Sequence, residues 1–232
     1  MEEGNLRMTT TGTPQGGVIS PLLANIYLHY LDRQWQQGHK RLGEMVRYAD
    51  DLVILCLTAQ AAEAALQQLT RILAELDLQT QPEKTRIRCL RKGQEGFDFL
   101  GFHHRKKESW RWKGRYYLQR WPNCKAMKAI RQKVKAIVGP RSLRYRTAQE
   151  VVQTLNPVLR GWGAYFRKGN SSRQLSQVDD YVAQQMRLYL SKKHQRRGRD
   201  WECWPDTFLY QELGLYRLSG TVEWYTSAKA HG

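Results

Sequence analysis

The sequence is poor in cysteine and contains no long hydrophobic run. Its four cysteines, Cys56, Cys89, Cys124 and Cys203, are far apart and form no Cys-x-x-Cys pair. This spacing argues against a zinc ribbon or a disulfide framework, and it predicts reduced thiols in an intracellular, cytoplasmic protein. No stretch approaches the roughly 18 apolar residues of a membrane span, and no secretory leader follows Met1. We therefore expect no membrane partner.

Acidic residues are scarce in one part of the chain. The protein has 232 residues and a formal net charge of +17, and residues 105–146 contain 15 Lys and Arg against one acid, Glu108. Residues 1–104, in contrast, contain 11 Lys and Arg against 12 Asp and Glu. Such a basic block is typical of proteins that bind nucleic-acid phosphates. A disordered basic tail is the alternative, but aromatic residues that favour order interleave with these charges: Trp110, Trp112, Tyr116, Tyr117 and Trp121.

Two adjacent carboxylates, Asp50 and Asp51, lie between short apolar runs at residues 45–48 and 52–56. Runs of this length, broken by a polar pair, predict two strands joined by a hairpin. No Gly, Pro or Asn marks the turn, and two carboxylates at one turn repel each other unless a cation lies nearby. An ordinary solvated hairpin and a Mg²⁺ site both fit this pattern, because Mg²⁺ prefers carboxylate oxygens and phosphoryl transfer uses pairs of such ions.

A glycine-rich segment precedes a predicted helix. Gly16 and Gly17 permit a ligand to approach the backbone closely. Ser20 is the predicted N-cap and Pro21 the first helical residue, and apolar residues at helical spacing continue the helix to about Gln36. This segment alone does not exclude a capped surface loop.

Together these segments resemble the palm of a reverse transcriptase, specifically of the group II intron reverse transcriptase/maturase family. The resemblance rests on residues 12–17 (Gly-Thr-Pro-Gln-Gly-Gly), 20–26 (Ser-Pro-Leu-Leu-Ala-Asn-Ile) and 47–51 (Arg-Tyr-Ala-Asp-Asp). It implies RNA-directed DNA polymerisation with Mg²⁺ as cofactor and with dNTP, an RNA template and a DNA primer as partners. By this resemblance Asp50 and Asp51 are catalytic residues that hold the metal. The residues implied to contact nucleotide and template are Gln15, Gly16, Gly17, Tyr48 and Ala49.

Two further segments extend the resemblance. Lys84 is implied to neutralise or protonate the leaving pyrophosphate, and a merely solvated lysine is an equal alternative. Residues 85–89 alternate in polarity and predict a half-buried strand, and residues 97–102 predict another. His103 and His104 have no third metal ligand at suitable spacing, so we expect them to contact nucleic acid or solvent. The residues implied to contact the primer are Phe99, Leu100, Gly101 and Phe102.

Helical patterns dominate after residue 122. Thr58, Asn123 and Thr147 are predicted N-caps, the last of them in a Thr-x-x-Glu capping box. Pro157 is expected to kink or interrupt the helix that Thr147 begins. Residues 156–166 resemble the maturase-specific domain (domain X), which forms the polymerase thumb and grips intron RNA. Its aromatic residues Trp162, Tyr165 and Phe166 are expected in the core. The predicted RNA-binding residues are Arg111, Lys113, Arg115, Lys125, Lys128, Arg131, Lys135, Arg160, Arg167 and Lys168.

The predicted fold class is α+β, an incomplete polymerase palm with an antiparallel sheet and packed helices, followed by an α-helical thumb. We predict a palm at 1–121, maturase-specific helices at 122–198 and a C-terminal extension at 199–232. Polymerases of this family place a third carboxylate on an earlier palm strand, after a fingers domain, and the eleven residues before Gly12 are too few for either. We therefore expect little polymerisation by this chain alone, and a separately encoded fingers fragment is a candidate partner. The alternatives are a non-catalytic splicing cofactor that binds intron RNA and an inactive remnant of a mobile element.

Overall fold

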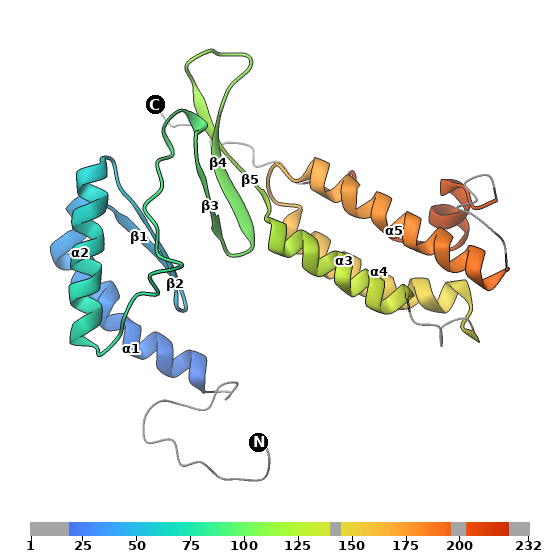
Figure 1. Ribbon diagram of the computed structural model, residues 1–232, viewed down its shortest axis with the longest axis horizontal. Helices are drawn as coiled ribbons and strands as arrows, with labels where there is room; N and C mark the ends of the chain where they lie inside the picture. The colour runs from blue at the N-terminus through green and yellow to red at the C-terminus, as the bar shows by residue number, and fades with distance from the viewer. Residues whose placement is uncertain (1–18, 140–144, 196–202, 223–232) are drawn as a thin grey trace, which may run out of the picture. The chain divides into compact units, whose positions relative to one another are not determined.

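The computed structural model describes residues 19–139, 145–195 and 203–222. The chain divides into two compact units, Met1–Cys89 and Leu90–Gly232, and each is described by itself (Figure 1). In the described part of the chain, no helix combines the length and the apolar character needed to cross a membrane.

The first unit is a β-hairpin covered on one face by helices. Its core contains Leu31 of the first helix, Trp35 of the turn after it, and Leu69 and Ile72 of the second helix. These residues pack against Met45, Leu52 and Ile54 of the hairpin. The other face of the hairpin is open, and Val46, Tyr48 and Leu55 are exposed there. The elements are α1 (Ser20–Gln34), a π-helical turn (Trp35–His39), a 3-10 turn (Lys40–Leu42), β1 (Glu44–Tyr48), β2 (Asp51–Leu55) and α2 (Ala59–Glu75).

Local signals predict the start of α2 and come within one residue of the start of α1. Thr58 caps α2 as predicted, and its hydroxyl accepts a hydrogen bond from the backbone N–H of Ala61 at 3.1 Å. The predicted cap at Ser20 is wrong by one residue, because Ile19 is the N-cap of α1. Pro21 still lies in the first turn, where its missing N–H costs nothing.

The strand predicted at residues 85–89 is wrong. These residues form no strand, and the side chain of Ile87 is 47% exposed. Among the residues that the structure describes, the first sheet contains only β1 and β2. An alternating pattern becomes a strand only where a neighbouring strand accepts its hydrogen bonds.

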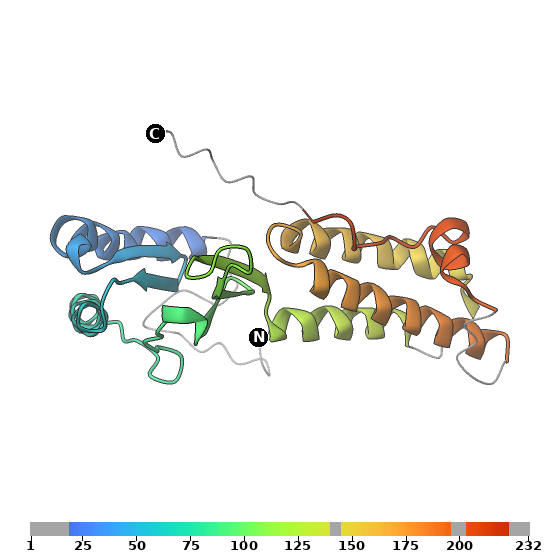
Figure 2. The same ribbon diagram turned by 90° about the horizontal axis from the view of Figure 1, so that it is seen from above.

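The second unit combines a three-stranded antiparallel sheet with three long helices. The strand order is β3-β4-β5. β3 pairs with β4 up to Phe99 opposite Phe102, and β4 pairs with β5 up to Glu108 opposite Tyr116. Figure 2 shows α3, α4 and α5 side by side. The elements are a 3-10 turn (Arg91–Gly93), β3 (Gly96–Phe99), β4 (Phe102–Glu108), β5 (Tyr116–Pro122), α3 (Cys124–Val138), α4 (Ala148–Phe166), α5 (Ser172–Lys193) and a π-helical turn (Phe208–Glu212).

The starts of α3 and α4 are those that the sequence predicts. The Asn123 side chain accepts a hydrogen bond from the N–H of Ala126 at 2.9 Å and caps α3. Thr147 and Glu150 form both halves of the capping box of α4. Pro157 does not interrupt the helix, since α4 continues from Ala148 to Phe166, and the alternative of a kink stays a prediction. Proline deprives the carbonyl of Gln153 of its partner, and Gln153 is exposed, so water can satisfy that carbonyl.

The segment that follows α5 is fastened to the helices by buried polar groups. The carboxylate of Asp179, which is 6% exposed, accepts hydrogen bonds from the backbone N–H groups of Leu218 and Ser219 at 2.8 and 2.7 Å. The side chain of Leu218 also packs closely on the backbone of α4 at Gly163, where an added Cβ would lie 2.5 Å from Leu218 Cδ2. The predicted C-terminal extension is therefore part of the helical core over residues 203–222.

We expect Asp179→Asn to lower the free energy of unfolding of the second unit by about 1–3 kcal/mol. The asparagine side chain has one oxygen, which can accept a hydrogen bond from only one of the N–H groups of Leu218 and Ser219. Its amide nitrogen then faces the other N–H, which loses its acceptor. Urea unfolding followed by circular dichroism measures the loss. Asp180→Asn, at the next and exposed position of α5, is the control, and an equal loss in both variants would contradict this account.

Candidate functional site

Asp50 and Asp51 lie at the tip of the β1–β2 hairpin. Tyr48 pairs with Asp51, so Ala49 and Asp50 form a two-residue turn. Ala49 has a φ of +53°, a left-handed conformation that costs a non-glycine residue about 1–2 kcal/mol. Both carboxylates are exposed, so solvent and ions can reach them.

Arg47 fastens this turn to helix α1. Its Nη1 donates a hydrogen bond to the carbonyl oxygen of Ala49 at 2.8 Å. Its Nε and Nη2 donate to the two carboxylate oxygens of Asp32 at 2.9 and 2.5 Å, and Nη1 also lies 3.1 Å from Asn25 Oδ1. The hydrogen bonds to Asp32 raise the pKa of Arg47 above its ordinary value, so the guanidinium stays charged. Arg47 is absent from the site residues predicted from the sequence, because its partners Asp32 and Asn25 are distant along the chain.

Asp50 and Asp51 both offer carboxylate oxygens, which are the ligand type that a hard divalent cation prefers. Among the residues that the structure describes, no group of three or more His, Cys, Asp and Glu side chains could hold a metal ion. The pair therefore supplies part of a ligand set, and Mg²⁺ binding stays a prediction.

Tyr48 and Ala49, which are predicted to contact nucleotide and template, lie at this turn, and those contacts stay predictions. Lys84 is exposed in a turn where its backbone N–H donates to Gln81 O at 3.1 Å. In the described residues, no hydrogen bond or ion pair joins its ammonium to Asp50 or Asp51. Gln15, Gly16 and Gly17 lie outside the described residues, so their predicted contacts stay predictions.

The predicted primer-contacting residues form a second two-residue turn, between β3 and β4. Leu100 and Gly101 have φ values of +47° and +78°, the combination of a type I′ turn. The carbonyl oxygen of Leu100 accepts a hydrogen bond from the hydroxyl of Tyr165 at 2.9 Å. That of Gly101 accepts one from the N–H of Asn123, also at 2.9 Å. The turn is therefore held by α4 and by the cap of α3.

Aromatic packing strengthens the attachment of this turn to the helices. The ring of Phe102 lies 4.9 Å from that of Phe166, and Phe166 is only 6% exposed, as expected for a core residue. The core prediction is wrong for Tyr165, which is 52% exposed and uses its hydroxyl on the turn. Phe166 continues the helical spacing of the buried residues Leu155, Leu159 and Gly163, whereas Tyr165 lies off this stripe.

The two histidines after this turn have partners within the sheet. His103 Nδ1 lies 2.7 Å from the carboxylate of Asp98. The ring of His104 stacks on Phe97 with centroids 5.0 Å apart. Burial, together with the positive charge of Arg120, lowers the pKa of His104 below its ordinary value. Their contact with nucleic acid stays a prediction.

Most of the predicted RNA-binding residues are exposed cations. On α3, Lys125, Lys128 and Lys135 are exposed, whereas Met127 and Val134 of the same helix are buried. Further exposed cations lie in the β4–β5 loop and on or after α4: Arg111, Lys113, Arg115, Arg160 and Lys168.

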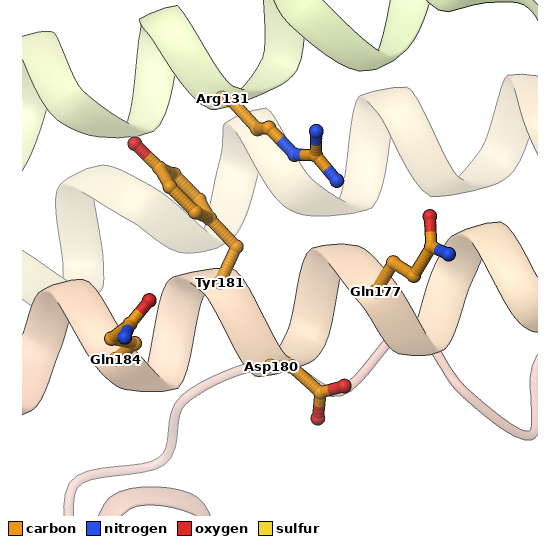
Figure 3. Close-up of a pocket in the computed structure, with 5 residues that line it drawn as sticks. All are labelled: Arg131, Gln177, Asp180, Tyr181 and Gln184. Carbon is orange, nitrogen blue, oxygen red and sulfur yellow. The ribbon is translucent and has the colours of Figure 1, made fainter.

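Arg131 differs from these cations because it lines a pocket between α3 and α5. The pocket has a volume of about 450 Å³, and Figure 3 shows Arg131 and Tyr181 directed into the space between the helices while Asp180 points away. The guanidinium carbon of Arg131 lies 5.9 Å from the centre of the Tyr181 ring. Arg131 is thus partly withdrawn from the exposed basic face, and Arg167 is likewise only half exposed.

Comparisons with known proteins match both parts of the chain. Residues 1–104 match the family described as reverse transcriptase (RNA-dependent DNA polymerase), and residues 127–206 match the group II intron, maturase-specific domain. Together these matches support a group II intron reverse transcriptase/maturase. The group II intron-encoded protein LtrA of Lactococcus lactis subsp. cremoris is 61% identical over 33 residues, which are 14% of this chain and 6% of LtrA. Protein YkfC of Escherichia coli (strain K12) is 30% identical over 47% of this chain and 36% of YkfC. The chain thus covers only a minor part of the length of these relatives.

The predicted α+β fold class is confirmed, because the structure combines small antiparallel sheets with a helical bundle. The domain boundaries predicted at 121/122 and 198/199 stay predictions. The compact units divide between Cys89 and Leu90, since the β3–β5 sheet packs on the helices that follow it through the contacts of Phe102 with Phe166.

We expect Arg47→Lys to lower the opening free energy of the β1–β2 amides by about 2 kcal/mol, because lysine keeps the charge but cannot make the forked contact with Asp32 and Ala49. Native-state hydrogen exchange measures this quantity. Arg33→Lys, at an exposed position of α1, should change it by less than about 0.5 kcal/mol. Equal effects of the two variants would rule out a specific contribution of the fork.

Proposed function

We propose that this chain acts in the cytoplasm as part of an RNA-directed DNA polymerase that also binds group II intron RNA and assists its splicing. The observation that carries the polymerase part is the Asp50–Asp51 pair on a turn fixed by Arg47. The match to both a reverse transcriptase and a maturase-specific domain supports the combination.

The reaction is nucleotidyl transfer. The 3′-hydroxyl oxygen of the primer forms a bond to the α-phosphorus of a dNTP, and the bond to the β-phosphate breaks to release pyrophosphate. Asp50 and Asp51 would hold Mg²⁺, which when bound neutralises phosphate charge and makes the attacking hydroxyl more acidic. Arg47 keeps the turn in one conformation through the carbonyl of Ala49. Lys84 would neutralise or protonate the leaving pyrophosphate.

The third carboxylate of the metal site would come from outside the described residues. No third carboxylate, His or Cys joins Asp50 and Asp51 in the part of the chain that the structure describes. Two ligands bind Mg²⁺ weakly, because the ion demands near-octahedral geometry and gives up water reluctantly. We infer that a polypeptide bearing the fingers and first palm strands completes the site.

We expect this chain alone to extend a primer on an RNA template slowly. Addition of a polypeptide with the fingers and first palm strands of a group II intron reverse transcriptase should then increase the rate. In that mixture Asp50→Asn should lower the rate by more than about 100-fold, since a charged ligand is lost. Asp77→Asn, an exposed carboxylate after α2, is the control. RNA binding without any Asp50-dependent synthesis would instead favour a non-catalytic splicing cofactor.

The exposed face of α3 supports the RNA-binding part of the proposal. Lys125, Lys128, Lys133 and Lys135 are exposed there, and the opposite face is buried in the helical core. Cations arranged in this way can neutralise phosphates without disturbing the fold. Each neutralised phosphate releases condensed counterions, so the affinity should fall as salt rises.

We expect the double variant Lys128→Gln, Lys135→Gln to reduce the slope of log K against log salt by about 1.4–1.8 for intron RNA. Fluorescence anisotropy over a salt titration measures the slope. Lys40→Gln with Arg41→Gln removes the same charge from exposed positions of the first unit and should leave the slope nearly unchanged. A general effect of net charge would give both variants the same reduction.

A further inference from the structure

The β4–β5 hairpin continues beyond the sheet that supports it. β3 pairs with β4 only from Phe99, opposite Phe102, to Gly96, opposite Arg105. From Lys106 onward β4 is paired only with β5, up to Glu108 opposite Tyr116, and Figure 1 shows this ribbon projecting past the end of β3. Residues 110–118 are all exposed.

The loop at the end of this ribbon, residues 109–115, is held by its own hydrogen bonds. The N–H of Ser109 donates to Arg115 O at 2.7 Å, and the N–H of Arg115 donates to Trp112 O at 3.2 Å. Glu108, the one acid of the basic block, accepts a hydrogen bond from the N–H of Gly114 at 2.7 Å. This carboxylate organises the backbone of the loop.

Two indole rings lie on this loop among cations. Trp110 is 93% exposed and Trp112 is 55% exposed. The guanidinium carbons of Arg111 and Arg115 lie 5.2 and 5.8 Å from the centre of the Trp112 ring. Trp110 has no ring or cation contact among the described residues, so both faces of its indole are accessible.

The combination of a bare aromatic face with nearby cations suits one kind of ligand. A base can stack on an indole only if the face of the base is uncovered, and inside a duplex neighbouring bases cover it. Phosphates of the same strand can pair with guanidinium and ammonium groups within the loop. An unpaired stretch of polynucleotide offers both groups together, whereas a duplex offers only the phosphates.

We propose that the loop at residues 109–115 is a binding site for single-stranded polynucleotide, in which Trp110 stacks on an unpaired base and Arg111, Lys113 and Arg115 bind the adjoining phosphates. This site rests on the proposed nucleic-acid function and specifies its ligand, an unpaired strand rather than a duplex. Template, primer and intron RNA all contain such stretches.

The test compares the full chain with Trp110→Leu and with Lys113→Gln. Anisotropy of a labelled 12-nucleotide single-stranded RNA, the same sequence as DNA, and a 12-base-pair RNA duplex is measured from 50 to 300 mM salt. Trp110→Leu should weaken single-strand binding about 10-fold or more at every salt concentration and change duplex binding less than about 2-fold. Lys113→Gln should reduce the single-strand salt slope by about 0.7.

Tyr145→Leu is the matched control, because Tyr145 is 94% exposed in the same unit and lies outside the hairpin. It should leave all affinities unchanged. Equal weakening of single-strand and duplex binding by Trp110→Leu, or a change below about 2-fold, would overturn the proposal. Thermal unfolding of each variant verifies that the fold is retained.

The same data separate this inference from the proposed function. If the unaltered chain binds neither single strands nor duplex, nucleic-acid binding itself fails. If it binds both and Trp110→Leu has no selective effect, only the loop site fails. Equal affinity for RNA and DNA strands would support a site that contacts base and phosphate alone. A preference for RNA together with the Trp110 effect would support the site with an added contact to the 2′-hydroxyl.

Discussion

Hydrogen bonds to single backbone carbonyls fix the two turns on which the proposed chemistry depends. Ala49 and Leu100 each occupy the first position of a two-residue hairpin turn with positive φ. In each case the carbonyl of that residue accepts a hydrogen bond from a side chain, Arg47 in one turn and Tyr165 in the other. The left-handed conformation is unfavourable for both residue types, so the surrounding structure must over-determine it. Arg47 is bound to Asp32 of α1, and Tyr165 belongs to α4, so each turn is attached to a helix.

The charge distribution of the second unit follows from how its acids are used. Glu108, Glu150 and Asp179 accept hydrogen bonds from backbone N–H groups and do not pair with Lys or Arg in the described contacts. A carboxylate that caps a helix or closes a loop contributes to stability, but it neutralises no neighbouring cation. The lysines on the exposed face of α3 are thus left for an external anion. Asp206 differs, because it pairs with Arg187 and Arg217, but neither arginine belongs to the exposed face of α3.

The sequence predicted elements whose signals are local and missed contacts between distant segments. The caps at Thr58, Asn123 and Thr147 are readable because donor and acceptor lie three residues apart. The strand expected at residues 85–89 failed because pairing needs a neighbouring strand, which no pattern within the segment reveals. Arg47 with Asp32, and Tyr165 with Leu100, join residues 15 and 65 positions apart. Carboxylates at a turn could therefore be predicted, but what holds that turn could not.

The two-stranded sheet of the first unit explains why the Asp50–Asp51 turn depends so strongly on α1. An isolated two-stranded hairpin is marginally stable in water, and here only one face of the hairpin is packed on helices. The outer edges of β1 and β2 have no strand partner in the described sheet, and Val46, Tyr48 and Leu55 are exposed on the open face. The forked contact of Arg47 with Asp32 compensates locally, since it ties the tip of the hairpin to a helix whose Leu31 is fully buried. Additional strands at an open edge would extend the sheet, and a carboxylate brought by them could approach Asp50 and Asp51 without any change in the turn.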